Sequence, residues 1–243
     1  MIIETFDSLP STNQYCELLD LREVEEFTII NAREQTAGIG QRGNHWESQP
    51  GMNLTFSLIL KPTFLPAAEQ YMLTKVVSLG ITDYLEELLP PSINIKIKWP
   101  NDIYINDHKV CGILISNKLS RTHLSASIVG IGLNVNQTEF PSWVPNPISL
   151  KQITGEELSL RPLLENIVQA IQTRYIQLPT NPAILDQEYL SRLLRLHQPA
   201  HYLYHGEAIT ATIQGVNQYG HLLLTTSESR PLTCQLKELT FLP

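Results

Sequence analysis

The sequence Ile-Lys-Ile-Lys-Trp-Pro-Asn-Asp occupies residues 95–102 and indicates a β-strand that ends in a tight turn. In an extended chain, successive side chains point to opposite faces, so Ile95, Ile97 and Trp99 face one way while Lys98 faces the other. Pro100 restricts the residue before it to extended conformations, and Pro-Asn-Asp is typical turn chemistry. Lys98 is therefore expected at a strand end, beside a tight turn.

The segments that follow and precede this stretch predict more strands and several helices. Four strand-like runs, separated by turn residues, predict a meander over residues 93–98, 103–105, 110–116 and 124–135. Earlier strands are predicted over residues 2–6, 27–31 and 53–60. Helical spacing of apolar residues predicts helices over 66–89 and 160–175, with shorter ones over 11–19 and 182–196, and Ser159 as the N-cap before Pro162. This order predicts a mixed sheet with packed helices.

The pattern changes after Pro199, where only short strands are predicted, over residues 201–204, 208–216, 221–226 and 232–236. About 45 residues are a marginal core on their own. We therefore predict two domains, residues 1–197 and a small β-barrel of residues 198–243 that docks on the first.

Charge and composition exclude several classes of protein. The 243 residues include 17 Lys+Arg and 24 Asp+Glu, a net charge of −7, with no basic run to hold nucleic acid. Hydrophobic residues at 42% and charged residues at 17% predict a globular core. No apolar run reaches the length of a membrane span, and the N-terminus lacks the features of a secretory signal. Three widely spaced cysteines suit reduced thiols, so we expect a cytoplasmic protein.

A glycine-rich segment, Glu34–Trp46, contains Gly38, Gly40 and Gly43 within six residues. Such a loop can turn its backbone N–H groups toward one point and bind a phosphate or carboxylate, with Arg42 adding a positive fork. The structural alternative is a long hairpin connection whose glycines satisfy only turn geometry.

Two other segments carry candidate polar groups. Lys98 is placed to neutralise a carboxylate and a phosphate together, although a solvated edge-strand lysine is the alternative interpretation. Ser11-Thr-Asn-Gln14 begins a helix, and a capping box accounts for Ser11 and Gln14. It leaves Thr12 and Asn13 unexplained, and a helix N-terminus can also recognise a small polar group.

Taken together, these motifs resemble the biotin protein ligases. The resemblance covers nearly the whole chain and rests on the Ser-Thr-Asn segment, the Gln-Thr-Ala-Gly-x-Gly loop ending in Trp46, Lys98-Trp-Pro-Asn-Asp102, Lys109-Val-Cys-Gly112-Ile-Leu, Gly130-Ile-Gly-Leu-Asn134 and the terminal strands. It implies an α+β fold with a mixed, mostly antiparallel sheet flanked by helices, like that of class II aminoacyl-tRNA synthetases, and a small C-terminal SH3-like β-barrel.

The resemblance also implies an activity. Members join biotin to AMP using ATP and Mg²⁺, forming biotinyl-5'-AMP, and pass the biotinyl group to one lysine of a biotin carboxyl carrier protein domain. By resemblance, biotin would be bound by Ser11, Thr12, Asn13, Gln35, Gly38, Ile39 and Gly112. The nucleotide would be bound by Gly40, Gln41, Arg42, Trp46, Lys98, Asn101 and Asn134, with Lys98 and Arg42 as the catalytic residues. The Mg²⁺ ligands, the base for acyl transfer and the oligomeric state cannot be inferred.

Two departures from the family pattern leave alternatives open. The loop has Ile39 and Gln41 where the family usually carries arginines, so we hypothesise that Arg42 contacts the α-phosphate; unchanged kinetics in Arg42→Ala would exclude this. The Ser-Thr-Asn segment begins at residue 11, so we expect a ligase without a repressor domain. The alternatives are a lipoyl or octanoyl acyltransferase and a non-catalytic biotin-binding protein.

Overall fold

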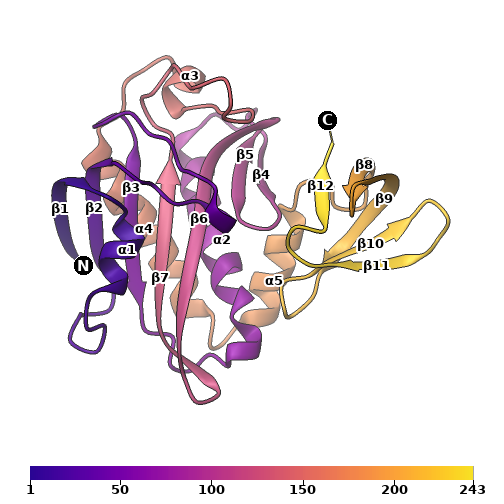
Figure 1. Ribbon diagram of the computed structural model, residues 1–243, viewed down its shortest axis with the longest axis horizontal. Coiled ribbons are helices and arrows are strands. Elements are labelled where there is room, and N and C mark those ends of the chain that lie inside the picture. Colours follow the sequence, from indigo (N-terminus) through magenta and orange to yellow (C-terminus); the bar gives the residue numbers. More distant parts are fainter. Residues whose placement is uncertain (243) are drawn as a thin grey trace.

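The computed structural model describes residues 1–242, apart from the side chain of Arg42, and its centre is a seven-stranded sheet (Figure 1). Only β1 and β2 pair in parallel; every other neighbouring pair is antiparallel. The order across the sheet is β1-β2-β3-β7-β6-β5-β4. The strands are β1 (Ile2–Leu9), β2 (Thr28–Gln35), β3 (Leu54–Leu60), β4 (Ile95–Lys98), β5 (Asp102–Ile105), β6 (His108–Ser120) and β7 (His123–Leu133).

Helices cover both faces of this sheet (Figure 1). The long helices α2 (Tyr71–Leu88) and α4 (Leu160–Gln177) pack together behind it, and α5 (Pro182–Ser191) packs on α2. The short helix α1 (Thr12–Glu17) lies in front. Because side chains alternate along a strand, β2 sends Ile29 into the large core and Ile30 into a smaller core around Cys16.

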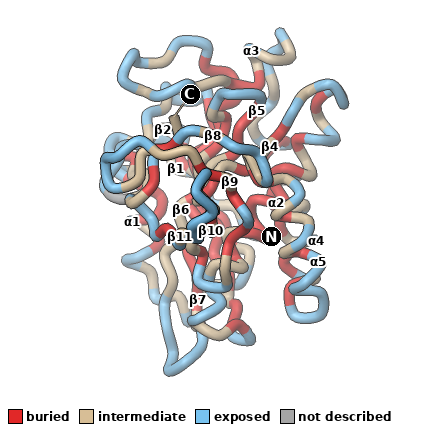
Figure 2. The backbone as a smooth tube through the Cα atoms, turned by 90° about the vertical axis from the view of Figure 1, so that its right-hand side faces the viewer, coloured by how far each residue is buried: buried red, intermediate tan, exposed pale blue. Residues whose placement is uncertain are grey.

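The last five strands form a second, entirely antiparallel sheet with the order β11-β10-β9-β8-β12. They are β8 (Pro199–Tyr204), β9 (Glu207–Val216), β10 (Leu222–Thr226), β11 (Pro231–Cys234) and β12 (Leu239–Phe241). Trp99 Nε1 donates a hydrogen bond of 2.9 Å to the carbonyl oxygen of Gly220. Apolar residues of the two sheets share one core, and Figure 2 colours buried segments of both sheets red.

The predicted fold class is confirmed: an α+β chain with a mostly antiparallel sheet and a small C-terminal β domain. The predicted meander is β4-β5-β6-β7. The exact domain boundary stays a prediction. No helix among residues 1–242 is long and apolar enough to cross a membrane.

Several details of the sequence prediction were wrong. The helix predicted from residue 66 begins at Tyr71, after a 3₁₀ turn over Ala67–Glu69, and the last helix ends at Ser191 rather than at 196. The short elements α3 (Leu150–Thr154) and β12 were not predicted. Ser159 stands at the N-cap of α4, but its side chain makes no capping hydrogen bond. Short elements carry too few periodic residues to be recognised.

Gly80 allows α2 and α4 to approach closely, and this contact gives a test of the packing. A Cβ at Gly80 would lie 2.5 Å from Ile171 Cα, a backbone atom that cannot rotate away. We expect Gly80→Val to lower the free energy of unfolding by about 3 kcal/mol, because overpacked cores cost this much. Urea denaturation measures the change, with the exposed Glu87→Ala on the same helix as control; an equal effect of both substitutions would contradict the packing argument.

Candidate functional site

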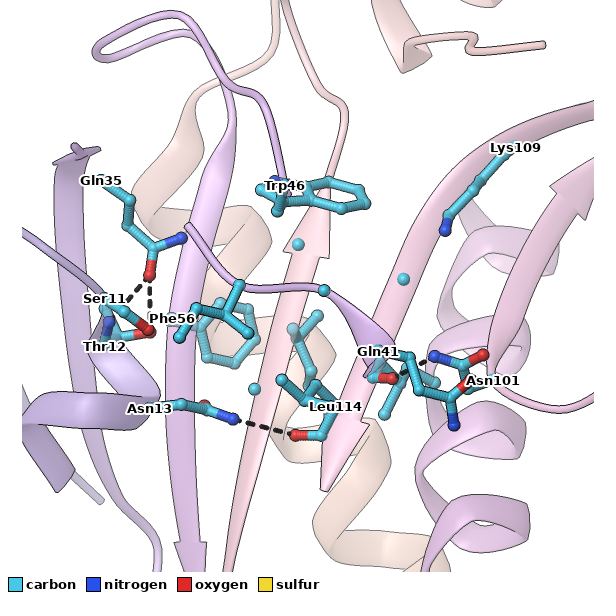
Figure 3. Close-up of a pocket in the computed structure, with 17 residues that line it drawn as sticks. Ser11, Thr12, Asn13, Gln35, Gln41, Trp46, Phe56, Asn101, Lys109 and Leu114 are labelled. Carbon is cyan, nitrogen blue, oxygen red and sulfur yellow. Dashed lines mark hydrogen bonds between the residues drawn. The ribbon is translucent and has the colours of Figure 1, made fainter. Parts of the chain in front are cut away.

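A cavity opens between the N-terminus of α1 and the middle of β6 and β7 (Figure 3). We call it the inner pocket. Polar side chains from α1 and β2 line one side, and glycines of β6 and β7 form its floor. Its lining residues are Ser11, Thr12, Asn13, Gln35, Ile39, Gly40, Gln41, Trp46, Phe56, Asn101, Lys109, Gly112, Ile113, Leu114, Gly130, Ile131 and Gly132.

A hydrogen-bond network fixes the polar side of the inner pocket (Figure 3). The Thr12 backbone N–H and hydroxyl both donate to Gln35 Oε1, at 2.8 and 3.2 Å. Asn13 Nδ2 donates to the Leu114 carbonyl oxygen at 3.1 Å. Ser57 Oγ donates to Asn13 Oδ1 at 2.5 Å and lies 2.8 Å from Thr12 Oγ1. The four predicted residues 11–13 and 35 therefore do meet in one site.

Ser11 and Ser57 complete this network in different ways. Ser11 is the N-cap of α1, and its Oγ accepts from the Gln14 N–H at 3.5 Å. The reciprocal bond of the predicted capping box is not formed among the described residues. Ser57 was not predicted at all, because an isolated serine in an apolar strand gives no sequence signal until its neighbours are known.

Glycines make the space in which Trp46 lies. A Cβ at Gly132 would lie 2.2 Å from Trp46 Cε2, and one at Gly112 would lie 3.0 Å from Trp46 Cζ3. The Trp46 indole therefore rests directly on β6 and β7, over the floor of the inner pocket. Its Nε1 is buried and has no hydrogen-bond partner in the described part of the chain. The glycine-rich loop is held at its base by the Trp46 N–H, which donates to Gly38 O at 3.0 Å.

Lys109 supplies the positive charge of the inner pocket. Its Nζ lies 2.7 Å from Asp102 Oδ1 and 5.6 Å from the centre of the Trp46 ring. A shift in register between β5 and β6 falls beside Lys109, which pairs with Tyr104 while Cys111 pairs with Ile103. This bulge buries two successive residues, Val110 and Cys111, and turns Lys109 to the same side as Gly112.

Lys98 does not line the inner pocket. Its Nζ donates to the Tyr104 hydroxyl at 3.0 Å and lies 5.2 Å from the centre of the Phe241 ring. Burial lowers the pKa of Lys98, Asp102 opposes that shift, and Lys109 adds to it. The catalytic role predicted for Lys98 stays a prediction. Lys109 belongs to a motif that carries the family resemblance, and it is the lysine that lines the inner pocket.

Two more cavities meet the inner pocket at Lys109 and Trp46, which line all three. The first of these, which we call the aromatic pocket, is lined by Gly43, Asn44, His45, Trp46, Glu47, Lys109, Asn134, Phe140, Trp143, Val144, Pro145 and Pro147. The second, which we call the C-terminal cleft, is lined by Gly40, Gln41, Asn44, His45, Trp46, Lys98, Trp99, Pro100, Asn101, Asp102, Lys109, Leu236, Lys237, Leu239, Thr240 and Phe241. Lys109 thus lies at the junction of the three cavities.

The remaining predicted residues fall around this junction. Asn101 Nδ2 donates to Ile113 O at 2.6 Å, and Asn134 Nδ2 donates to Ile148 O at 3.1 Å, so both amides hold the backbone beside the cavities. Gln41 lines the inner pocket and the C-terminal cleft. The side chain of Arg42 lies outside the described part of the structure. Within residues 1–242, no three His, Cys, Asp or Glu side chains come together as a metal site.

Residues 5–134 match the model of the biotin/lipoate A/B protein ligase family. The chain belongs to this family. It is 32% identical over 231 residues to the bifunctional ligase/repressor BirA of Bacillus subtilis, covering 91% of this chain and 69% of that one. It is 34% identical over 178 residues to the biotin–[acetyl-CoA-carboxylase] ligase of Paracoccus denitrificans, covering 70% and 72%.

A solved structure of the family supports the same conclusion. The Aquifex aeolicus biotin protein ligase in complex with biotin and ATP superposes with a TM-score of 0.80 at 27% identity. The match covers 98% of this chain and 97% of that one. The biotin/lipoate ligase family fold therefore extends through both sheets.

The position of Trp46 on the glycine floor can be tested directly. We expect Gly132→Ala to displace the indole, because the added methyl would lie 2.2 Å from it. Iodide quenching of fluorescence measures the exposure of Trp46 in a background where Trp99 and Trp143 are phenylalanine. Quenching should rise relative to Ser125→Ala, a control near the far end of β7; equal quenching in the two variants would contradict this placement.

Proposed function

We propose that this chain is an ATP-dependent biotin protein ligase that forms biotinyl-5'-AMP and transfers the biotinyl group to a lysine of a carrier domain. The observation that carries the proposal is the meeting of three cavities at one lysine, Lys109. The relatives named as biotin ligases and the Aquifex complex with biotin and ATP support it. A cytoplasmic location fits the three free, buried cysteines and belongs to the same proposal.

In this proposal the inner pocket binds biotin. Its ureido ring carries N–H donors and a carbonyl acceptor, and the network of Ser11, Thr12 and Gln35 offers matching groups at the closed end. The apolar body of biotin would lie beside Phe56 and Ile131, next to the Trp46 indole, which itself occupies the floor at Gly112 and Gly132. The carboxylate would then point toward Lys109, at the other end of the inner pocket (Figure 3).

The aromatic pocket suits the nucleoside of ATP. Phe140 and Trp143 offer flat apolar faces on which a base can stack, and Asn134 lines the same pocket. The α-phosphate would then lie near Lys109, which lines both pockets. Mg²⁺ commonly binds through phosphates and water. Among the described residues that line the three cavities, the carboxylates are Glu47 in the aromatic pocket and Asp102, which is paired with Lys109, so the ion would be held mainly by ATP.

Adenylation brings two anions together, and Lys109 stands between them. The biotin carboxylate oxygen attacks the α-phosphorus, the bond to the bridging oxygen breaks, and pyrophosphate leaves with that electron pair. A fixed ammonium group stabilises the charge that develops in this step. Trp46 lines all three cavities, and its apolar ring beside the reacting groups would limit access of water to the mixed anhydride. In the second step a neutral lysine amine of the carrier attacks the acyl carbon, and AMP leaves.

The first experiment is biotin-dependent exchange of labelled pyrophosphate into ATP by the purified protein. We expect exchange with biotin and none with lipoate. Exchange with lipoate alone would favour an acyltransferase of the other branch of the family. Biotin binding without exchange would favour a non-catalytic binding protein and would overturn the ligase proposal.

The two candidate lysines can be separated in the same assay. We expect Lys109→Ala to lower the exchange rate by about 100-fold or more, because it removes the charge at the reacting atoms. Lys98→Ala should lower it by about tenfold, since its Nζ lies on the neighbouring cleft. Lys118→Ala, near the distant end of β6, is the control. A larger loss for Lys98→Ala than for Lys109→Ala would restore the sequence-based assignment.

Ser57 gives a test of the polar network. Ser57→Ala leaves Asn13 Oδ1 without its donor, so we expect biotin affinity to fall about tenfold while ATP affinity changes little. Isothermal titration calorimetry measures both affinities, with Ser125→Ala as the control serine. A parallel loss of both affinities would mean that Ser57 supports the fold rather than the biotin end of the site.

A further inference from the structure

A buried ion pair joins α2 to α5 outside the three cavities. Lys75 of α2 pairs with Asp186 of α5, and the Lys75 side chain is only 3% exposed, whereas that of Asp186 is 40% exposed. The Lys75 ammonium also lies 5.7 Å from the centre of the Tyr71 ring and 5.6 Å from that of the Tyr189 ring. None of these four residues lines a cavity of the candidate site, so the function proposed above does not use this charge.

The ion pair fixes the register in which α2 meets α5. Tyr71 and Lys75 are separated by one turn of α2, and Asp186 and Tyr189 by one turn of α5, so each helix presents both residues on one face. With Lys75 held by Asp186, the two tyrosine hydroxyls lie 2.9 Å apart. A slide of one helix along the other would break the ion pair and the contact between the hydroxyls together.

The Tyr71 hydroxyl connects this helix pair to the turn before β5. It donates to the Pro100 carbonyl oxygen at 3.0 Å, so its own oxygen accepts from the tyrosine of α5. Burial raises the pKa of Tyr71 well above its usual value, which keeps the proton that this donor needs. The next two residues are Asn101, which lines the inner pocket, and Asp102, which pairs with Lys109. The contacts that begin at the ion pair therefore end at the proposed reacting lysine.

The energetics of a buried ion pair favour a positioning role over a stabilising one. The attraction between the two charges is largely offset by the cost of removing them from water, so an apolar residue in place of such a pair often costs no stability. The two partners also differ in exposure. Loss of Lys75 leaves a carboxylate that water already reaches, whereas loss of the Asp186 charge leaves a buried ammonium unpaired. Positioning and stability can therefore be separated by the choice of partner to replace.

We propose that Lys75 is a positioning residue for adenylation: its ion pair with Asp186 sets the register of α2 on α5, and Tyr71 transmits that register to the turn that presents Asp102 to Lys109. The proposal rests on the ligase function proposed above. The polar network of the inner pocket is built from α1, β2 and β3, on other elements than this turn. A displaced turn should therefore slow adenylation without weakening the binding of biotin.

The test compares Lys75→Met with Tyr71→Phe in the full chain, by biotin-dependent exchange of pyrophosphate into ATP. We expect each substitution to lower the maximal exchange rate roughly tenfold, because small displacements at the reacting atoms are costly, and to leave biotin affinity within about twofold. The double variant should be no slower than the slower single variant, because both substitutions interrupt the same series of contacts. Tyr84→Phe, a tyrosine of α2 whose hydroxyl accepts from Asn166, is the matched control and should exchange at the wild-type rate.

Urea denaturation separates positioning from a general loss of stability. We expect Asp186→Asn to lower the urea midpoint more than Lys75→Met does, because only the first leaves a buried charge without its partner. Both should slow exchange. Wild-type exchange rates in Lys75→Met and Tyr71→Phe, or rate losses that multiply in the double variant, would overturn the proposal. An equal fall of exchange rate and biotin affinity in Lys75→Met would also overturn it, because the ion pair would then serve the whole fold.

A second readout does not depend on activity. The Trp99 indole N–H donates to Gly220 O, and Gly220 packs so closely on the Tyr71 ring that a Cβ there would overlap it. We therefore expect Lys75→Met to shift the NMR signal of the Trp99 indole N–H and to leave that of Trp143 in place. An absence of exchange in the wild-type protein would overturn the ligase function alone. An unmoved Trp99 signal in Lys75→Met would overturn the positioning proposal, whether or not the wild-type protein is active.

Discussion

The ion pair between Lys109 and Asp102 is the interaction around which the site is built. Its two partners come from adjacent strands, and the 2.7 Å contact fixes the lysine at the meeting point of three cavities. The pair needs the bulge in β6, which turns Lys109 out of the core, and it needs the turn after Trp99, which places Asp102 at the start of β5. Without this carboxylate, the partly exposed ammonium of Lys109 would lose the partner that offsets its desolvation.

The same turn couples the catalytic sheet to the C-terminal sheet. The Trp99 indole reaches Gly220 of the second sheet, and Tyr71 of α2 donates to the carbonyl oxygen of Pro100 at 3.0 Å. Tyr71 is in turn 2.9 Å from the Tyr189 hydroxyl of α5. Two helices and the second sheet thus hold the turn that immediately precedes Asp102. The small β domain therefore helps to hold the turn before Asp102, and it also forms a wall of the C-terminal cleft.

Much of the fold and part of the candidate site were predictable from the sequence. Periodicity identified the long helices and most of the strands, and the resemblance singled out Ser11, Thr12, Asn13 and Gln35, which do line one pocket, because they belong to two recognisable segments. The position of Lys109 could not be predicted in the same way. Strict alternation along β6 puts Lys109 on the same face as Cys111, which is buried in the core, and only the bulge moves it to the pocket. Ser57 was missed because its contacts with Thr12 and Asn13 come from packing between segments far apart in the chain.

The central claim is that three ligand groups meet at Lys109, and one structure tests it most directly. A crystal structure of the protein with a non-hydrolysable analogue of biotinyl-5'-AMP should place the bicyclic ring beside Ser11 and Thr12 and the adenine beside Trp143. The linking phosphate should lie at Lys109. An adenine in the C-terminal cleft, or a linking phosphate that contacts Lys98 and not Lys109, would contradict the account.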